Sequence, residues 1–206
     1  MDVRTINTKN RILNGLIKVL STQKLSECRT IDIINQAEVS KKTFYNYFKN
    51  KKDFIHWVET NILISLKNAL QKDRTSLEDT HNASEQKIME LANSAFNVTL
   101  KYCDDHKDTL AVLLSDNGDI NLYHAIINFA NDEFLEWAPY LFNTTRAEIQ
   151  RIPLYKFFQT LYVDSIIKLL LFWLNHRSTM SIDDVKYLAG LIQTKSNIQL
   201  MKSLAN

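Results

Sequence analysis

The sequence predicts an all-α protein, and three observations carry this prediction. The chain has only three Gly and two Pro in 206 residues, whereas β-sandwiches and barrels need many turns rich in these residues. Hydrophobic residues make up 45% of the chain, which is ample for a core. They recur every three or four residues over most of the length, which is the spacing of one face of an α-helix.

The N-terminal segment predicts a helix followed by a helix–turn–helix. The first helix covers residues 8–22, with Thr8 as its cap, whereas Lys9 and Arg11 lie off its apolar stripe and could contact phosphate. The helix–turn–helix covers residues 30–48. Its caps are expected at Thr30 and Ser40, and Val39 fills the turn between its two helices.

The second helix of this pair has two different faces. Phe44 and Phe48, four residues apart, are expected to bury its inner face. Its outer face carries hydrogen-bond donors and aromatic hydroxyls with no apolar residue between them. These residues are Lys41, Lys42, Thr43, Tyr45, Asn46 and Tyr47. A short helix with such an outer face suits insertion into a DNA major groove.

The net charge of +2 conceals an uneven distribution. Residues 1–55 contain eleven Lys and Arg against five Asp and Glu, and the remainder of the chain contains fourteen against eighteen. Positive charge is therefore concentrated around the helix–turn–helix, as binding to a polyanion requires. Without that motif, a solvated basic face would be the simpler interpretation.

Further helices are expected along the rest of the chain. Asn117, Gly118 and Asp119 predict a turn in which Gly118 takes a positive φ, and Pro139 predicts the end of a helix. Pro153 and Ser181 predict the starts of the last two helices. The expected helices cover residues 49–72, about 84–103, 107–115, 120–137, 145–151, 154–173 and 181–198.

The helix that begins near Pro153 is apolar around most of its circumference, so it must be buried nearly all round. A homodimer whose paired C-terminal helices form a four-helix interface would bury it. A monomer with a deeply buried central helix is the alternative.

Other features indicate a soluble, cytoplasmic protein. Cys28 and Cys103 form no ligand pattern and fit a reducing compartment. The N-terminus has no apolar signal-peptide core. The most apolar run, residues 166–174, includes Lys168. It is too short for a membrane span, which needs about 20 residues. We expect no membrane association, no cofactor and no bound metal.

Residues 8–54 resemble the DNA-binding domain of the tetracycline-repressor (TetR) family. The resemblance rests on Thr43-Phe44-Tyr45-Asn46-Tyr47-Phe48, followed by the Lys51-Lys52 exit. Residues 114–119, and much later 172–174, are similar to a subset of the family from low-GC Gram-positive bacteria. The resemblance implies a DNA-binding domain over residues 1–52 and a larger helical ligand-binding and dimerisation domain over residues 53–206.

The chain departs from the family pattern at three positions. Glu38 stands where the family has Gly before the turn valine, so a positive φ is less comfortable and a negative charge lies near phosphate. The family's Gly after the first helix is replaced around Lys24, and Tyr47 stands where the family has His.

The resemblance also implies roles for individual residues. Lys41 and Lys42 would reach base edges or phosphate, and Thr43 a thymine methyl or phosphate. Tyr45, Thr30 and Lys51 would contact phosphate, and Asn46 and Tyr47 the groove or phosphate. The expected DNA-binding set is Thr30, Ser40, Lys41, Lys42, Thr43, Tyr45, Asn46, Tyr47 and Lys51.

By the same resemblance, an unknown small-molecule inducer would bind among the helices of the larger domain and change the separation of the two DNA-binding heads. Candidate pocket residues are polar or aromatic side chains on apolar faces, although ordinary core packing would explain each of them too. They are Phe96, Tyr102, Cys103, His124, Trp137, Tyr162 and Trp173. A metal sensor built from Cys103, His106 and His124 is an alternative, but no dense Cys/His cluster supports it.

Two classes of function compete on this evidence. The first is a dimeric, ligand-responsive transcriptional regulator that represses by binding double-stranded DNA at a palindromic operator. The second is a co-regulator that docks another protein because Glu38 has weakened DNA binding. No phosphate loop, nucleophile motif or paired-carboxylate motif stands out, so no catalytic residue and no enzymatic activity are expected.

Overall fold

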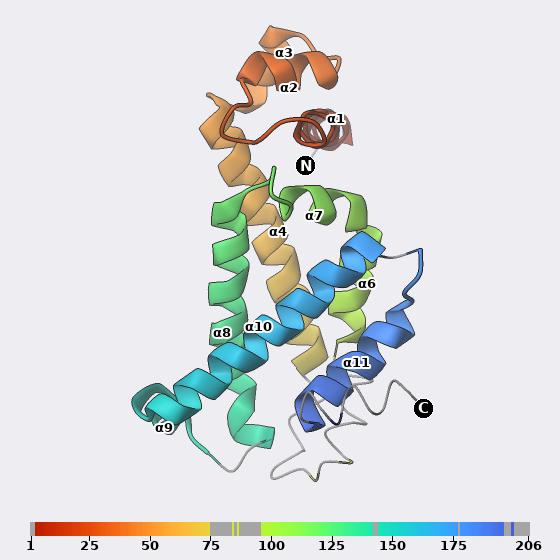
Figure 1. Cartoon of the computed structure of the whole chain (residues 1–206). Helices are drawn as coiled ribbons and strands as arrows, with labels where there is room; N and C mark the ends of the chain where they lie inside the picture. Colours follow the sequence, from red (N-terminus) through yellow and green to blue (C-terminus); the bar gives the residue numbers. More distant parts are fainter. Residues whose placement is uncertain are drawn as a thin grey trace. The chain divides into compact units, whose positions relative to one another are not determined.

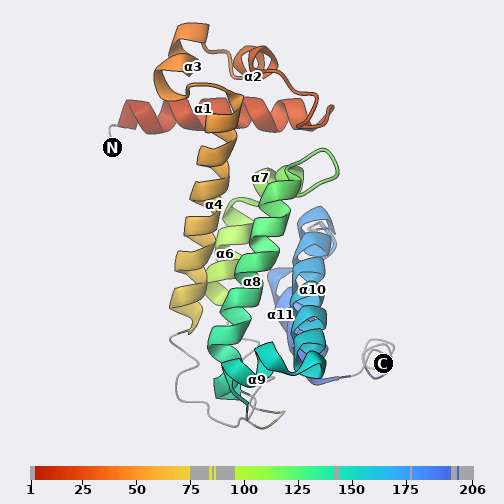
Figure 2. The ribbon, with the colours of Figure 1, turned by 90° about the vertical axis from the view of Figure 1, so that its left-hand side faces the viewer.

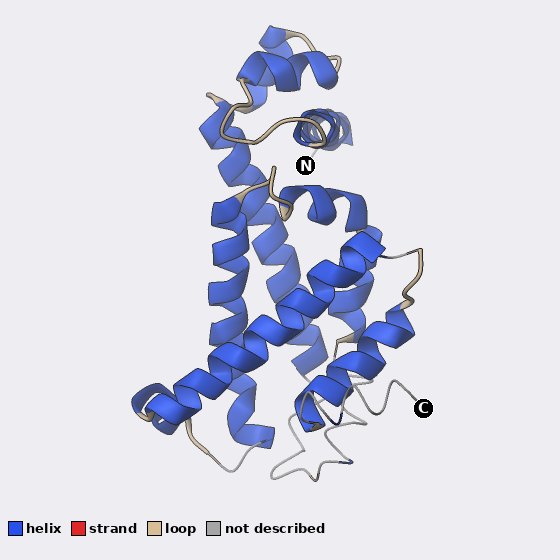
Figure 3. Ribbon diagram, viewed as in Figure 1, coloured by secondary structure: helices blue, strands red, loops and turns tan. Residues whose placement is uncertain are grey.

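The structure is a computed structural model that describes residues 3–74, 84, 86, 96–141, 144–176, 178–195 and 199. Within these residues all regular secondary structure is α-helical, with ten helices and no strand (Figure 3). The all-α prediction is confirmed. The helix expected from about residue 84 to residue 103 is described only in its C-terminal part, because residues 87–95 lie outside the described ranges.

The chain forms two compact units. The first comprises Met1–Ser65 and His106–Tyr123, and the second comprises Leu66–Asp105 and His124–Asn206. Two helices, α4 (Lys51–Arg74) and α8 (Ile120–Leu141), begin in the first unit and end in the second. The expected division at residue 52 concerns function and stays a prediction.

In the first unit, α1 (Val3–Leu20) packs against α2 (Thr30–Gln36), and α3 (Lys41–Tyr47) follows α2 (Figure 1). Gly15 permits the close packing of α1 on α2, because a Cβ at this position would lie 2.7 Å from the Cβ and the N of Ala37. The predicted Thr8 cap is wrong. Helix α1 starts earlier, and the Thr8 hydroxyl donates to the Arg4 carbonyl inside it at 2.9 Å.

Four aromatic rings join α3 to the start of α4. Phe44 and Phe48 are buried, as predicted, and their ring centroids lie 5.9 and 4.9 Å from that of Phe54. The Trp57 ring lies 5.5 Å from that of Phe48. Lys9 of α1 places its ammonium 5.4 and 5.0 Å from the Phe48 and Trp57 ring centroids, so it covers the cluster by cation–π contacts.

The turn that follows α7 (Lys107–Leu113) holds the connection between α1 and α2. The Leu25 N–H donates to the Asn117 carbonyl at 2.8 Å, and the Asn117 side chain donates to the Leu20 carbonyl at 3.2 Å. The positive φ expected for Gly118 is wrong. A glycine is needed there because an added Cβ would lie 2.0 Å from the Leu113 carbonyl oxygen.

The second unit contains α6 (Asn97–Asp105), α9 (Arg146–Arg151), α10 (Pro153–His176) and α11 (Ile182–Thr194), with the ends of α4 and α8. Helices α10 and α11 pack side by side (Figure 2). The starts predicted from Pro153 and Ser181 are confirmed, and Ser181 Oγ accepts from the Asp184 N–H at 3.2 Å. Pro139 does not end α8, which continues to Leu141, because a proline near the last turn removes only one helical hydrogen bond.

Helix α10 is not buried all round within one chain. Gln159, Tyr162, Val163 and Trp173 are among its buried residues. Its opposite face leaves several large apolar side chains exposed. These are Leu154, Tyr155, Phe157, Phe158, Leu161 and Phe172. By length and composition alone, α10 is also a helix that could span a membrane, although a core helix of a soluble protein meets the same criteria.

Gly15→Ala should destabilise the protein by about 1 kcal/mol. The added methyl group must move the Ala37 backbone and the Ile33 carbonyl, and such overpacking costs about 1–3 kcal/mol, which exceeds the about 1 kcal/mol gained in helix propensity. Urea unfolding followed by circular dichroism measures the difference. Asn14→Ala, at the exposed neighbouring position, is the control and should be neutral or slightly stabilising. A Gly15→Ala protein as stable as the control would contradict the close packing of α1 on α2.

Candidate nucleic-acid interface

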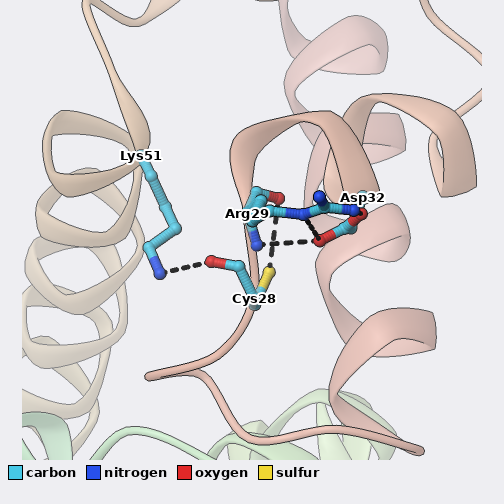
Figure 4. A network of polar contacts seen from close by, with 4 residues as sticks. All are labelled: Cys28, Arg29, Asp32 and Lys51. Atoms are coloured by element: carbon cyan, nitrogen blue, oxygen red, sulfur yellow. Dashed lines mark hydrogen bonds and ion pairs between the residues drawn. The ribbon is translucent and has the colours of Figure 1, made fainter.

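An ion pair organises the start of α2. Arg29 precedes the helix, and the Asp32 carboxylate accepts from the Arg29 N–H at 2.9 Å and from its guanidinium at 3.2 and 3.0 Å (Figure 4). These hydrogen bonds hold the pKa of Asp32 below its usual value. The predicted Thr30 cap is wrong, because Thr30 is the first residue of the helix and lies partly exposed.

Lys51 ties the start of α4 to the segment before α2. Its ammonium donates to the Leu25 carbonyl at 2.9 Å and to the Cys28 carbonyl at 2.5 Å, and Figure 4 shows the contact with Cys28. Cys28 itself is buried, and burial raises the pKa of its thiol. The phosphate contact of Lys51 stays a prediction, although two acceptors already engage its ammonium. Sequence reasoning missed this structural role, because the carbonyls that Lys51 contacts carry no sequence signature.

The turn between α2 and α3 is left-handed at Glu38, where φ is +52°. A residue other than Gly in this conformation costs about 1–2 kcal/mol. The Arg11 guanidinium of α1 donates to the Glu38 carbonyl at 2.8 Å and to the Ala37 carbonyl at 3.4 Å. Arg11 therefore supports the turn, whereas the sequence suggested a phosphate contact for it.

Ser40 caps α3, as predicted. Its hydroxyl oxygen accepts from the Thr43 N–H at 2.9 Å and lies 2.8 Å from the Thr43 hydroxyl oxygen. At the next helix start, the Asn50 side-chain oxygen accepts from the Asp53 N–H at 2.9 Å. The Asp53 carboxylate in turn accepts from the Lys49 N–H at 2.8 Å. Both ends of the α3 segment are thus fixed by short polar contacts.

Most polar side chains on the outer face of α3 are exposed and form no hydrogen bond with the residues that the structure describes. Lys41, Lys42 and Asn46 are exposed and form no side-chain hydrogen bond or ion pair within the described part of the chain. Tyr45 is 54% exposed, and its ring packs edge-to-face against that of Phe44, with the ring centroids 5.5 Å apart. Tyr47 is half-buried beside Phe48. Two ammonium groups, an amide and a phenol therefore project from a helix whose inner face is fixed in the core, an arrangement that can donate to phosphates and base edges.

The structure brings together only some of the predicted ligand-binding residues. Phe96, Trp137 and Tyr162 line a cavity of about 90 Å³ in the second unit. The other four do not line it. Cys103 and Trp173 are buried elsewhere, Tyr102 is half-buried and His124 is exposed.

Two of these four residues have other roles in the structure, and ligand binding by any of the seven stays a prediction. The Trp173 indole N–H donates to the Met180 carbonyl at 3.2 Å, so its polar end is already satisfied. Burial raises the pKa of the Cys103 thiol to about 12, as for an inert core cysteine. Among the described residues, no group of three or more His, Cys, Asp or Glu side chains could hold a metal ion, so the metal-sensor alternative gains no site there.

Sequence reasoning missed much of the cavity wall. Glu133 and Phe134 of α8 and Lys186 of α11 line it together with aliphatic residues of α10. Glu133 pairs with Arg74 at the end of α4 at 3.5 Å. Helical periodicity marks the apolar members of such a wall but does not show which helices enclose a space.

Comparisons with known proteins add little. No protein-family model matches the chain, and no curated protein matches it significantly. Among solved structures, the dihydroxyacetone kinase operon activator DhaS aligns with a TM-score of 0.47 and 15% identity over 97% of both chains. An alignment this weak carries no argument about fold or function.

Glu38→Gly should stabilise the protein by about 1 kcal/mol. Glycine removes the strain of the left-handed conformation, which stabilises the folded state by about 1–2 kcal/mol. Its greater backbone freedom in the unfolded chain offsets about 0.5–1 kcal/mol of this gain. Thermal and urea unfolding measure the change. Glu38→Ala removes the same charge but keeps a Cβ at the strained position, so it should not stabilise. Equal stabilisation by both variants would show that the carboxylate, rather than the backbone, is responsible.

Proposed function

We propose that the protein is a transcriptional regulator of the tetracycline-repressor type. It would act as a cytoplasmic, ligand-responsive repressor whose homodimer binds a palindromic operator in double-stranded DNA. The observation that carries this proposal is the outer face of α3, whose inner face is fixed by the buried Phe44. The exposed residues of the outer face are Lys41, Lys42, Tyr45 and Asn46. The resemblance of residues 8–54 to the family's DNA-binding domain supports the same conclusion.

The geometry favours contact with DNA over a merely solvated surface. No acidic side chain lies within α3 to neutralise Lys41 and Lys42. Lys49 and Lys52 extend the exposed positive charge to the start of α4. Exposed cations that release counterions from phosphate give binding that weakens steeply with salt. The expected DNA contacts are therefore Lys41, Lys42, Tyr45 and Asn46, with Thr30, Ser40, Thr43, Tyr47 and Lys51 nearer the backbone.

A second copy of the chain is the proposed partner for the exposed face of α10. Leu154, Phe157 and Leu161 are 71%, 66% and 54% exposed, and Phe172 continues the same face. Their spacing of three, four and eleven residues is that of a helix–helix seam. A two-fold pairing of α10 would remove these side chains from water and present two copies of α3, which a palindromic operator requires.

This pairing also explains α10 better than a membrane span does. Lys168 lies exposed on the same face, and Asp164 lies half-exposed near the middle of the helix. Gln159, on the buried side, donates to the Asn131 carbonyl at 3.1 Å. Charged groups at mid-helix are costly in a bilayer but are ordinary in a protein interface.

The competing proposal is a co-regulator that docks another protein and has little affinity for DNA. The strained turn at Glu38 favours it, because a carboxylate at the edge of the motif opposes phosphate. It predicts no DNA complex at low salt and recovery of a regulator partner instead.

Lys42→Ala should weaken operator binding about tenfold, since a base contact is worth about 1–3 kcal/mol. Tyr45→Ala should have a similar effect through a lost phosphate contact. Fluorescence anisotropy measures both at several salt concentrations, using a duplex from the DNA flanking the gene and a scrambled duplex of equal length. Lys67→Ala, which removes an exposed lysine of α4 in the second unit, is the matched control and should bind as the wild type.

The salt dependence distinguishes the two roles of Lys42. Loss of a phosphate contact lowers the slope of log affinity against log salt by about 1 on every sequence. Loss of a base contact reduces the preference for the specific duplex. A wild-type protein that binds both duplexes equally would contradict sequence-specific regulation.

Leu161→Lys should convert the dimer into a monomer. At a two-fold interface the new ammonium groups would lose their hydration and the apolar packing of Leu161 would be lost, and a pairing with Asp164 one turn away would not offset both costs. Sedimentation equilibrium measures the mass, and circular dichroism checks that the helices persist. Thr160→Lys, at the exposed neighbouring position on α10, should remain dimeric. A dimeric Leu161→Lys protein would place the interface elsewhere.

A further inference from the structure

The cavity of the second unit is lined mainly by apolar side chains of α6, α8, α10 and α11, with Leu70 from the end of α4. Three aromatic rings meet in its wall. The Phe134 and Trp137 ring centroids are 4.9 Å apart, and each lies 5.2 Å from the centroid of Tyr162. Its volume is about 90 Å³.

Tyr162 places a buried hydroxyl group in this mainly apolar wall. Its side chain is only 8% exposed, and burial raises the pKa of its phenol. Within the described part of the chain, its hydroxyl has no hydrogen-bond partner. A buried hydroxyl without a partner costs about 1–3 kcal/mol, and buried tyrosine hydroxyls normally find one.

Among the residues that the structure describes, the other polar side chains of the wall already have partners. The Thr99 hydroxyl donates to the Asp73 carboxylate at 2.7 Å. Glu133 pairs with Arg74 at 3.5 Å, and Lys186 lies 3.9 Å from Asp183. A charged ligand would therefore lose its hydration without gaining an unpaired counter-charge. A bound water molecule needs two to four polar partners, and the Tyr162 hydroxyl would be only one.

We propose that this cavity binds a small, uncharged, largely apolar molecule with one hydrogen-bonding oxygen, which pairs with the Tyr162 hydroxyl. The size follows from the volume. A cavity of about 150 Å³ accommodates benzene, so about 90 Å³ fits a compact molecule of roughly four to six heavy atoms. That this molecule is the inducer rests on the proposed function, whereas its binding does not.

A pair of isosteric probes tests the chemistry. Butan-2-one carries a carbonyl oxygen where 2-methylbut-1-ene carries a methylene group, so the two share shape and differ in one acceptor. Their dissociation constants are measured by NMR titration of the purified full-length protein without DNA. The alkene is more apolar than the ketone, so leaving water favours its binding more strongly. The test therefore uses the ratio of the ketone and alkene dissociation constants, and how that ratio changes between variants.

Tyr162→Phe should shift this ratio about tenfold against the ketone, because the variant keeps the ring and loses the donor. Removing an unpartnered hydroxyl should not lower the melting temperature, so folding is not at risk. Tyr187→Phe removes an exposed phenol of α11 outside the cavity and should leave the ratio unchanged. Ala130→Leu, which fills the cavity, should weaken both probes.

An unchanged ratio in Tyr162→Phe would overturn the proposal, as would ketone binding that Ala130→Leu does not affect. Because these titrations contain no DNA, their failure leaves the DNA-binding proposal standing. Conversely, a protein that binds no operator could still bind the ketone through Tyr162. The two proposals therefore fail separately.

Discussion

The position of the proposed recognition helix depends on one strained turn. Glu38 adopts a left-handed conformation that favours glycine, and the Arg11 guanidinium holds its carbonyl at 2.8 Å. Gly15 allows α1 to approach Ala37 closely enough for Arg11 to reach the turn. The outer face of α3 can only be presented in a fixed register if this turn is fixed, because α3 begins three residues after Glu38. A contact between a helix and a backbone carbonyl therefore governs the exposed side chains that would meet DNA.

Helices α4 and α8 are tied to each other in both units. In the first unit, Asp119 caps α8 by accepting from the Asn121 N–H at 3.0 Å, and it meets Glu59 of α4. Burial, and then the charge and hydrogen bond of Asp119, raise the pKa of Glu59. In the second unit, Arg74 of α4 pairs with Glu133 of α8 beside the cavity. Under the proposed function, these two helices are the continuous elements through which occupancy of the cavity would reach the DNA-binding unit.

The sequence predicted what depends on periodicity and local chemistry. The all-α class, the Ser40 and Ser181 caps, and the buried Phe44 and Phe48 all follow from spacings within a few residues. The sequence did not reveal contacts that exist only in the folded backbone. The sequence suggested that Arg11 could contact phosphate and did not reveal its carbonyl acceptors, which lie 26 and 27 residues away. The turn at Gly118 is present, but crowding against Leu113 rather than a positive φ requires the glycine. Three of the candidate ligand-binding residues line the cavity and His124 is exposed, because periodicity does not show which helices enclose a space.

Neighbouring residues of α10 carry two different proposed functions. Tyr162 lines the cavity, and Leu161 belongs to the exposed face that a second copy would cover. A helix is stiff along its length, so a ligand that displaces Tyr162 must also displace or rotate the face next to it. Packed interfaces respond to such shifts by changing between discrete arrangements rather than by deforming continuously. Under the proposed function, the position of Tyr162 one residue from the exposed face would couple ligand binding to the geometry of the dimer, and through the dimer to the spacing of the two α3 helices. Such a coupling would require no contact between the ligand and the proposed recognition helices.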